Sequence, residues 1–154
     1  MLKMNNRQIT GNVGLYYVSY KLSRMGWNVM TTSRNAKGVD IMAYNEDVKI
    51  IHKIQVKSYT ERQAISFGNK VEIFSDFYVI VTYVYKKPVV YLLKGSEVEP
   101  LIRKQKEQNW LEIEDYEKNE FLENWEKIGC GWVEKEKCDS IRKIDNERGK
   151  VSEV

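Results

Sequence analysis

The stretch GVDIMAYNEDVKIIHKIQVKS, residues 38–58, decides the fold. It holds two apolar runs separated by the polar residues 45–47, which is a composition typical of a β-hairpin. If the two runs pair antiparallel through this turn, Asp40 lies at the end of the hairpin that carries Gln55 and Lys57. Gln55 and Lys57 are two residues apart on one strand, so they point to the same face. We therefore expect three polar side chains to meet at one end of the hairpin.

The segment before the hairpin predicts a helix and a strand. Thr10 is a good N-cap, and the apolar residues that follow it recur at helical spacing up to residue 25. Gly26 stands where a helix commonly ends in a left-handed turn. Residues 27–31 then predict a short strand, the first of the sheet.

The segment after the hairpin predicts two more strands. Residues 59–76 have a poor pattern, which indicates a loop with a short helix or strand. Residues 77–85 and 88–94 are rich in β-branched and aromatic residues and predict strands joined by a tight turn. Together the elements predict an α/β fold, with a central mixed sheet of about five strands flanked by helices.

The C-terminal part predicts helices and an appendage. Residues 98–107 and 117–129 look helical, and Gly129 closes the second of them. The charged residues 130–154 predict a loosely docked helix or a disordered tail. We therefore expect one domain over residues 1–129 and an appendage over residues 130–154.

Composition indicates a soluble globular protein. The chain has 154 residues, of which 42% are hydrophobic and 31% charged. It has neither an apolar run of about 18 residues nor the apolar core of a signal peptide at its N-terminus, so we expect a cytoplasmic protein with no membrane partner. A single histidine with Cys130 and Cys138 excludes a zinc site made of Cys and His alone, and we expect both thiols to be reduced.

The charge is unevenly distributed. Residues 1–94 hold 14 Lys and Arg against 6 Asp and Glu, a net charge of +8, whereas residues 95–154 have a net charge of −5. The basic part therefore suits contact with a polyanion.

The polar cluster at the end of the hairpin suits phosphodiester hydrolysis. The Asp40 carboxylate, the Gln55 side-chain oxygen and the Val56 backbone carbonyl are oxygen ligands for a hard divalent cation, Mg²⁺ or Mn²⁺. Such a cation polarises a phosphate and acidifies its bound water. Lys57 could orient that water or stabilise the developing negative charge.

These residues resemble the motif of a known superfamily. A helix that opens with GNVG, then GVD, and then QVK about fourteen residues later resembles the PD-(D/E)XK nucleases, which include restriction endonucleases and archaeal Holliday-junction resolvases. The resemblance covers roughly residues 7–104 and implies an αβββαβ core. It matches Asp40 to the metal-binding Asp, Gln55 to the acidic position of (D/E)XK, and Lys57 to the catalytic Lys.

The chain departs from the family pattern twice. Gln55 replaces an acid, which removes a negative charge but keeps an oxygen ligand. Many relatives also carry a Glu on the first helix, at a place where this chain reads Gly14-Leu15-Tyr16. If Leu15 occupies that place, Asp40 is the only carboxylate of the inferred site.

Polar loops border the cluster and predict contacts with phosphates. The residues expected to bind nucleic acid are Ser33, Arg34 and Lys37 before Asp40, Ser58 and Arg62 after Lys57, and Lys53 on the strand behind Gln55 and Lys57. Ordinary solvated loops would have the same composition, so the sequence leaves both interpretations open for each residue.

Three functions therefore remain. The first is a metal-dependent endonuclease that cuts DNA, expected to be a homodimer by analogy with small members of the superfamily. The second is an inactive protein of the same fold that binds nucleic acid or a protein partner. The third is an unrelated α/β binding domain, in which the cluster of Asp40, Gln55 and Lys57 is accidental.

Overall fold

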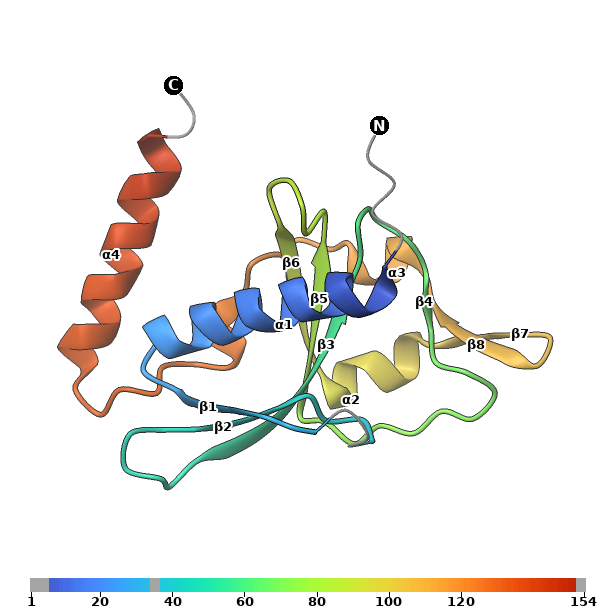
Figure 1. The fold of residues 1–154 in the computed structure, drawn as a ribbon, viewed down its shortest axis with the longest axis horizontal. Helices are drawn as coiled ribbons and strands as arrows, with labels where there is room; N and C mark the ends of the chain where they lie inside the picture. Colours follow the sequence, from blue (N-terminus) through green and yellow to red (C-terminus); the bar gives the residue numbers. More distant parts are fainter. Residues whose placement is uncertain (1–5, 34–36, 152–154) are drawn as a thin grey trace.

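The structure is a computed structural model that describes residues 6–33 and 37–151 (Figure 1). Its helices are α1 (Arg7–Arg24), α2 (Gly95–Val98), α3 (Ile113–Tyr116) and α4 (Lys135–Val151), with 3₁₀ turns η1 (Glu99–Leu101) and η2 (Trp125–Lys127). Its strands are β1 (Asn28–Thr31), β2 (Ile41–Tyr44), β3 (Ile51–Ser58), β4 (Ile65–Ser66), β5 (Phe77–Thr82), β6 (Val89–Lys94), β7 (Arg103–Gln105) and β8 (Gln108–Leu111).

The main sheet is mixed and has five strands in the order β1-β2-β3-β5-β6. β3 and β5 run parallel, and the other neighbouring pairs are antiparallel. The predicted α/β fold with a mixed sheet of about five strands is therefore confirmed. β4, β8 and β7 form a second sheet of three strands, which the sequence did not predict.

The predicted hairpin is β2 and β3, but its connection covers residues 45–50 and is longer than the predicted turn at 45–47; Asn45 closes it. Ile41 lies opposite Ile54, and Tyr44 lies opposite Ile51. The Asn45 side-chain oxygen accepts a hydrogen bond of 2.8 Å from the backbone N–H of Ile50. An asparagine that bonds to nearby backbone in this way is a common turn-former, which explains why the chain reverses here.

Helix α1 covers one face of the main sheet (Figure 1). Its buried stripe is Thr10, Gly14, Val18 and Leu22, spaced by four residues along the helix. Val18 and Leu22 share a core with Ile54 of β3 and Val79 of β5. The inward side chains of alternate strand residues form this first core.

The ends of α1 differ in part from the prediction. Its N-cap is Asn6, whose side chain accepts hydrogen bonds from two backbone N–H groups of the first turn, and Thr10 is a buried residue inside the helix. The prediction of Thr10 as N-cap was therefore wrong. Gly26 does follow the C-terminal end with a φ of 88°, in the left-handed conformation that glycine adopts most readily.

The opposite face of the main sheet is covered by the second sheet, α2 and α3. Tyr78, Ile80 and Leu93 point to this side and pack against Ile65 of β4 and Leu111 of β8. Every residue of β5 is buried, because this strand lies between two layers. The site described below lies at the edge of this second core.

The connection between β3 and β5 corrects the αβββαβ order. That order places a helix between these two parallel strands, but residues 59–76 form an extended connection that contains β4. β4 pairs with β8, with Ile65 opposite Leu111. The connection therefore contributes a strand to the second sheet instead of forming a helix.

The predicted helix over residues 117–129 was wrong. Leu92 N–H donates to Phe121 O at 2.9 Å, and Glu123 N–H donates to Val90 O at 2.8 Å. The segment thus runs along the outer edge of β6 and satisfies backbone groups that an edge strand leaves open. Only η2 remains helical in this described segment.

The predicted helix over residues 98–107 was also wrong beyond η1. The chain leaves η1 into β7, turns at Lys106, which has a φ of 57°, and returns as β8. Gln105 and Gln108 are opposite each other in this hairpin. Pairing of β7 with β8, which itself pairs with β4, outweighs the moderate helix preference of this polar segment.

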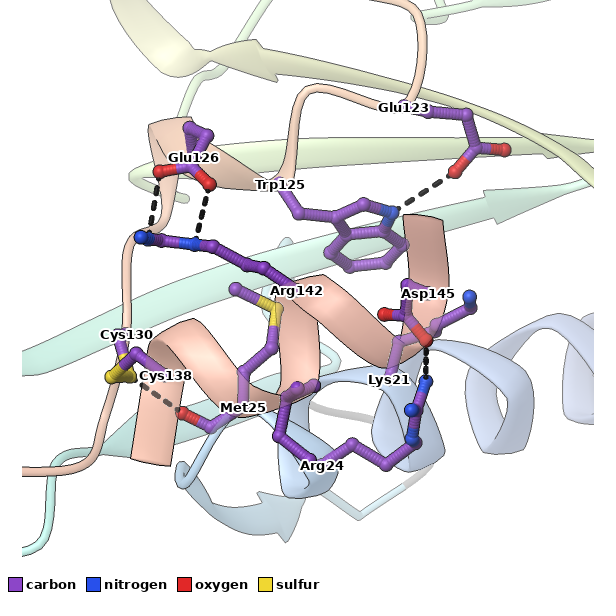
Figure 2. Close-up of a pocket in the computed structure, with 11 residues that line it drawn as sticks. Lys21, Arg24, Met25, Glu123, Trp125, Glu126, Cys130, Cys138, Arg142 and Asp145 are labelled. Carbon is purple, nitrogen blue, oxygen red and sulfur yellow. Dashed lines mark hydrogen bonds and ion pairs between the residues drawn. A yellow bond between two sulfur atoms is a disulfide. The ribbon is translucent and has the colours of Figure 1, made fainter. Parts of the chain in front are cut away.

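Residues 130 and 138 form a disulfide, which corrects the prediction of reduced thiols. The Cα atoms of Cys130 and Cys138 are 6.1 Å apart, within the range that a disulfide spans. Cys138 lies in helix α4, drawn red in Figure 1, so the disulfide ties this helix to the segment that follows η2. Arg142 of α4 pairs with Glu126, and Asp145 of α4 pairs with Arg24 of α1 across a small pocket (Figure 2).

No helix in the described part of the chain is both long and apolar enough to cross a membrane.

Candidate active site

The β2–β3 register brings Asp40, Gln55 and Lys57 to one face of the main sheet. Because Ile41 pairs with Ile54, the next residues outward, Asp40 and Gln55, lie opposite each other. Opposite residues of antiparallel strands point to the same face, and Lys57 shares that face because it is two residues from Gln55. This face is the one opposite α1.

Two hydrogen bonds fix Asp40 against β3. Its N–H donates to Ile54 O at 2.9 Å, and its Oδ2 accepts from the N–H of Val56 at 2.8 Å. Asp40 thus continues the hydrogen bonding between β2 and β3 just beyond the end of β2. The carbonyl of Val56 points to the same edge of β3 as its N–H, so it also lies on the Asp40 side.

Lys57 is half-buried beside Asp40. Burial lowers the pKa of Lys57, and the negative charge of Asp40 opposes that change. The Lys57 Nζ lies 5.5 Å from the centroid of the Phe67 ring. An ammonium in this position is partly desolvated, which strengthens its interaction with a negatively charged phosphate.

Tyr78 is a member of the cluster that sequence reasoning missed. It lies opposite Gln55 on β5, so its side chain shares the face of Gln55 and Lys57. Burial, and to a smaller extent Asp40, raise the pKa of Tyr78, and the backbone of Phe74 acts in the opposite direction. Because β5 is buried on both faces, no alternation in its sequence could single out this tyrosine.

The loop before β5 contacts the chain just before Asp40. Gly38 has a φ of 71°, and a Cβ at this position would lie 2.5 Å from the Phe74 ring. Ser75 Oγ donates a hydrogen bond of 2.5 Å to the carbonyl of Gly38. Lys37 Nζ lies 2.7 Å from the carboxylate of Glu72. The loop thus holds the chain that leads into Asp40.

The residues predicted to contact phosphates are spread around this cluster. Ser33, Lys37, Lys53 and Arg62 are exposed, and Arg62 Nε lies 3.4 Å from the carboxylate of Glu117. Ser58 lies on the other face of β3, against Gly14 of α1. Arg34 lies outside the described residues.

Leu15 contributes no charge to the cluster. It packs against the first core, on the side of the sheet that α1 covers. Gln55 and Lys57 point to the opposite side. Asp40 is therefore the acid that the β2–β3 hairpin itself supplies to the cluster.

The oxygen atoms of this cluster could bind a divalent cation, but they would fill only part of its coordination shell. Among the described residues, no group of three or more His, Cys, Asp or Glu side chains is placed to hold a metal ion. The carboxylate of Asp40, the amide oxygen of Gln55 and the carbonyl of Val56 are all hard oxygen donors with one negative charge between them. Mg²⁺ often binds through one or two carboxylates, with waters and substrate phosphates as its other ligands.

Comparison with known proteins finds a nuclease of the same fold. No family model and no curated protein matches the sequence. A solved structure of a bacterial homing endonuclease, I-Ssp6803I, matches 81% of this chain and 94% of its own, with a TM-score of 0.56 and 16% sequence identity. The chain therefore shares a fold with this endonuclease.

Proposed function

We propose that the protein is a divalent-metal-dependent endonuclease that hydrolyses phosphodiester bonds in DNA. The observation that carries the proposal is the common placement of Asp40, Gln55 and Lys57 at one end of the β2–β3 hairpin. The shared fold with a homing endonuclease supports the same interpretation. The finer assignment to the PD-(D/E)XK superfamily rests on the D…QxK pattern and is part of the proposal.

Each residue has a distinct part in the proposed reaction. Asp40, the Gln55 side chain and the Val56 carbonyl hold Mg²⁺ or Mn²⁺, which when bound polarises the scissile phosphate and acidifies a water molecule. Lys57 orients the attacking water and stabilises the charge that develops on the phosphate oxygens. The exposed Lys37 and Lys53 hold the flanking backbone.

One observation favours a second candidate, an inactive protein of the same fold that binds DNA. Asp40 provides a single carboxylate, and one of its oxygens already accepts a hydrogen bond from Val56. An ion held by one formal charge binds weakly unless the substrate phosphate adds ligands. The two candidates share the same residues and differ only in whether the bond is cut.

Nicking of supercoiled and branched DNA with Mg²⁺ or Mn²⁺ separates the two candidates. We expect cleavage by the wild type and a loss of roughly 100-fold or more in both Asp40→Ala and Lys57→Ala. Lys87→Ala is the matched control, because Lys87 is an exposed lysine in the turn between β5 and β6. Equal activity in all four proteins would refute the assigned site.

A binding assay completes the comparison. If no protein cleaves but all bind DNA with an affinity that falls steeply with salt, the inactive DNA-binding protein is the correct interpretation. If the wild type neither cleaves nor binds, both candidates fail.

A further inference from the structure

A polar groove adjoins the candidate active site at the carboxyl end of β3. It has a volume of about 740 Å³ and lies between the first turn of α1, the chain that follows β3, and β8. We call it the Trp110 groove; the lining residues that matter here are Arg7, Thr10, Ser58, Gln63, Ser66 and Trp110. Its volume falls in the range typical of ligand pockets.

The groove and the catalytic cluster are neighbours but do not share residues. Ser58, which lines the groove, directly follows Lys57 on β3. Ser66, also in the lining, directly precedes Phe67, whose ring lies beside the Lys57 ammonium. The groove therefore lies at the carboxyl end of the strand that carries Lys57, and Ser58 points to the opposite face of that strand.

The lining suits a negatively charged and hydrogen-bonding ligand. Arg7 is its charged side chain, and no carboxylate is found among the described lining residues. Thr10 offers a hydroxyl whose Oγ1 lies 3.1 Å from Tyr85 Oη, whereas the Ser58 hydroxyl is buried against Gly14 of α1. Cationic and hydroxyl groups are the usual contacts of nucleic-acid phosphates and sugars.

Trp110 turns its ring away from the second core and towards the groove. On β8, Asn109 and Leu111 are buried, and Trp110, which lies between them, is only partly buried. It lies opposite Ser66 of β4, which also lines the groove. A tryptophan on a polar wall offers a flat surface on which a nucleic-acid base can stack.

We propose that the Trp110 groove binds an unpaired segment of DNA beside the bond that is cut, an inference that rests on the proposed nuclease function. Bases inside a duplex stack on their neighbours, so only an unpaired base can lie on the Trp110 ring. The preferred substrate then has unpaired nucleotides next to duplex, as in a flap, a loop or a branched junction.

Binding in the absence of divalent metal tests the groove without any need for cleavage. Fluorescence anisotropy compares a short labelled oligothymidylate with a labelled blunt duplex. We expect Trp110→Ala to weaken oligothymidylate binding roughly 5- to 150-fold, the effect of losing one stacked base, and to leave duplex binding unchanged. Trp110→Phe should keep most of the affinity because it retains an aromatic face.

Trp125→Ala is the matched control, since Trp125 is a partly buried tryptophan in the pocket beside α4. It should bind the oligothymidylate as the wild type does. Thermal unfolding of each variant shows whether it is folded. An unchanged affinity in folded Trp110→Ala, or an equal loss for oligothymidylate and duplex, would overturn the proposal.

Cleavage assays keep this inference separate from the proposed function. If oligothymidylate binding depends on Trp110 but no DNA is cut, the groove is correct and the nuclease is not. If DNA is cut equally well with and without unpaired nucleotides, and Trp110→Ala changes neither rate, the nuclease stands and the groove does not.

Discussion

Replacing Gly14 by alanine should separate α1 from the strand that carries the candidate site. An added Cβ at Gly14 would lie 1.6 Å from Ser58 Oγ and 2.5 Å from Ser58 Cβ. The hydroxyl can rotate, but the Cβ is fixed to the β3 backbone, so the helix or the strand must move. Such overpacking costs about 1–3 kcal/mol in the free energy of unfolding.

Gly11 on the same helix provides a matched control, because a Cβ there would meet no atom within 4 Å. Both substitutions gain the helix preference of alanine, about 1 kcal/mol. Gly11→Ala should therefore stabilise the protein by about that amount. Gly14→Ala should be about 1–3 kcal/mol less stable than Gly11→Ala.

Urea unfolding measures both variants on the same scale. A double-mutant cycle with Ser58→Gly then tests the cause, because that change removes both atoms that the new Cβ would meet. We expect a coupling of about 1–3 kcal/mol between positions 14 and 58. Equal stability of the two alanine variants, or no coupling in the cycle, would refute the reasoning.

Two further predictions concern stability. Removing the disulfide with Cys130→Ser and Cys138→Ser should lower the free energy of unfolding by about 2–3 kcal/mol, because a short loop is no longer closed in the unfolded chain; urea unfolding with and without reductant measures this. Burial lowers the pKa of His52, the single histidine, below 6.5, and the negative charge of Asp76 opposes this change. As the pH falls, the unfolded chain therefore takes up the proton before the folded chain does. His52 contributes stability above about pH 6.5, and this contribution is lost as the pH falls through its folded pKa. His52→Gln should remove this part of the pH dependence, and NMR titration of the one imidazole reports its folded pKa; a folded pKa at or above 6.5 would contradict the prediction.

The main sheet could be predicted because its strands carry local signals. The polar residues 45–47 and the apolar runs on either side of them indicate the β2–β3 hairpin, but its register depends on a connection over residues 45–50 that is longer than the predicted turn. Once that register is known, the common face of Asp40, Gln55 and Lys57 follows from the two-residue period of a strand. The shared face of Gln55 and Lys57 was therefore accessible without coordinates, whereas the position of Asp40 opposite Gln55 required the observed register.

The second sheet and the edge of β6 could not be predicted in the same way. Residues 117–129 have the composition of a helix, yet their backbone groups pair with β6, which lies far away in the sequence. Within residues 98–107, residues 103–105 form β7 against β8, and β8 in turn pairs with the distant β4. Pairing partners that lie far apart in the chain leave no periodic signal in either segment.

The sequence by itself determined the hairpin, the five strand segments of the main sheet, and the acid, amide and lysine near the end of the hairpin. Only the tertiary structure decided what surrounds them. Tyr78 joins the cluster through a parallel pairing, and Phe67 covers Lys57 through the connection that carries β4. The Trp110 groove forms where α1 and β8 approach the end of β3. Local pattern fixes the conformation of a segment, whereas a site built from several segments depends on how their cores pack together.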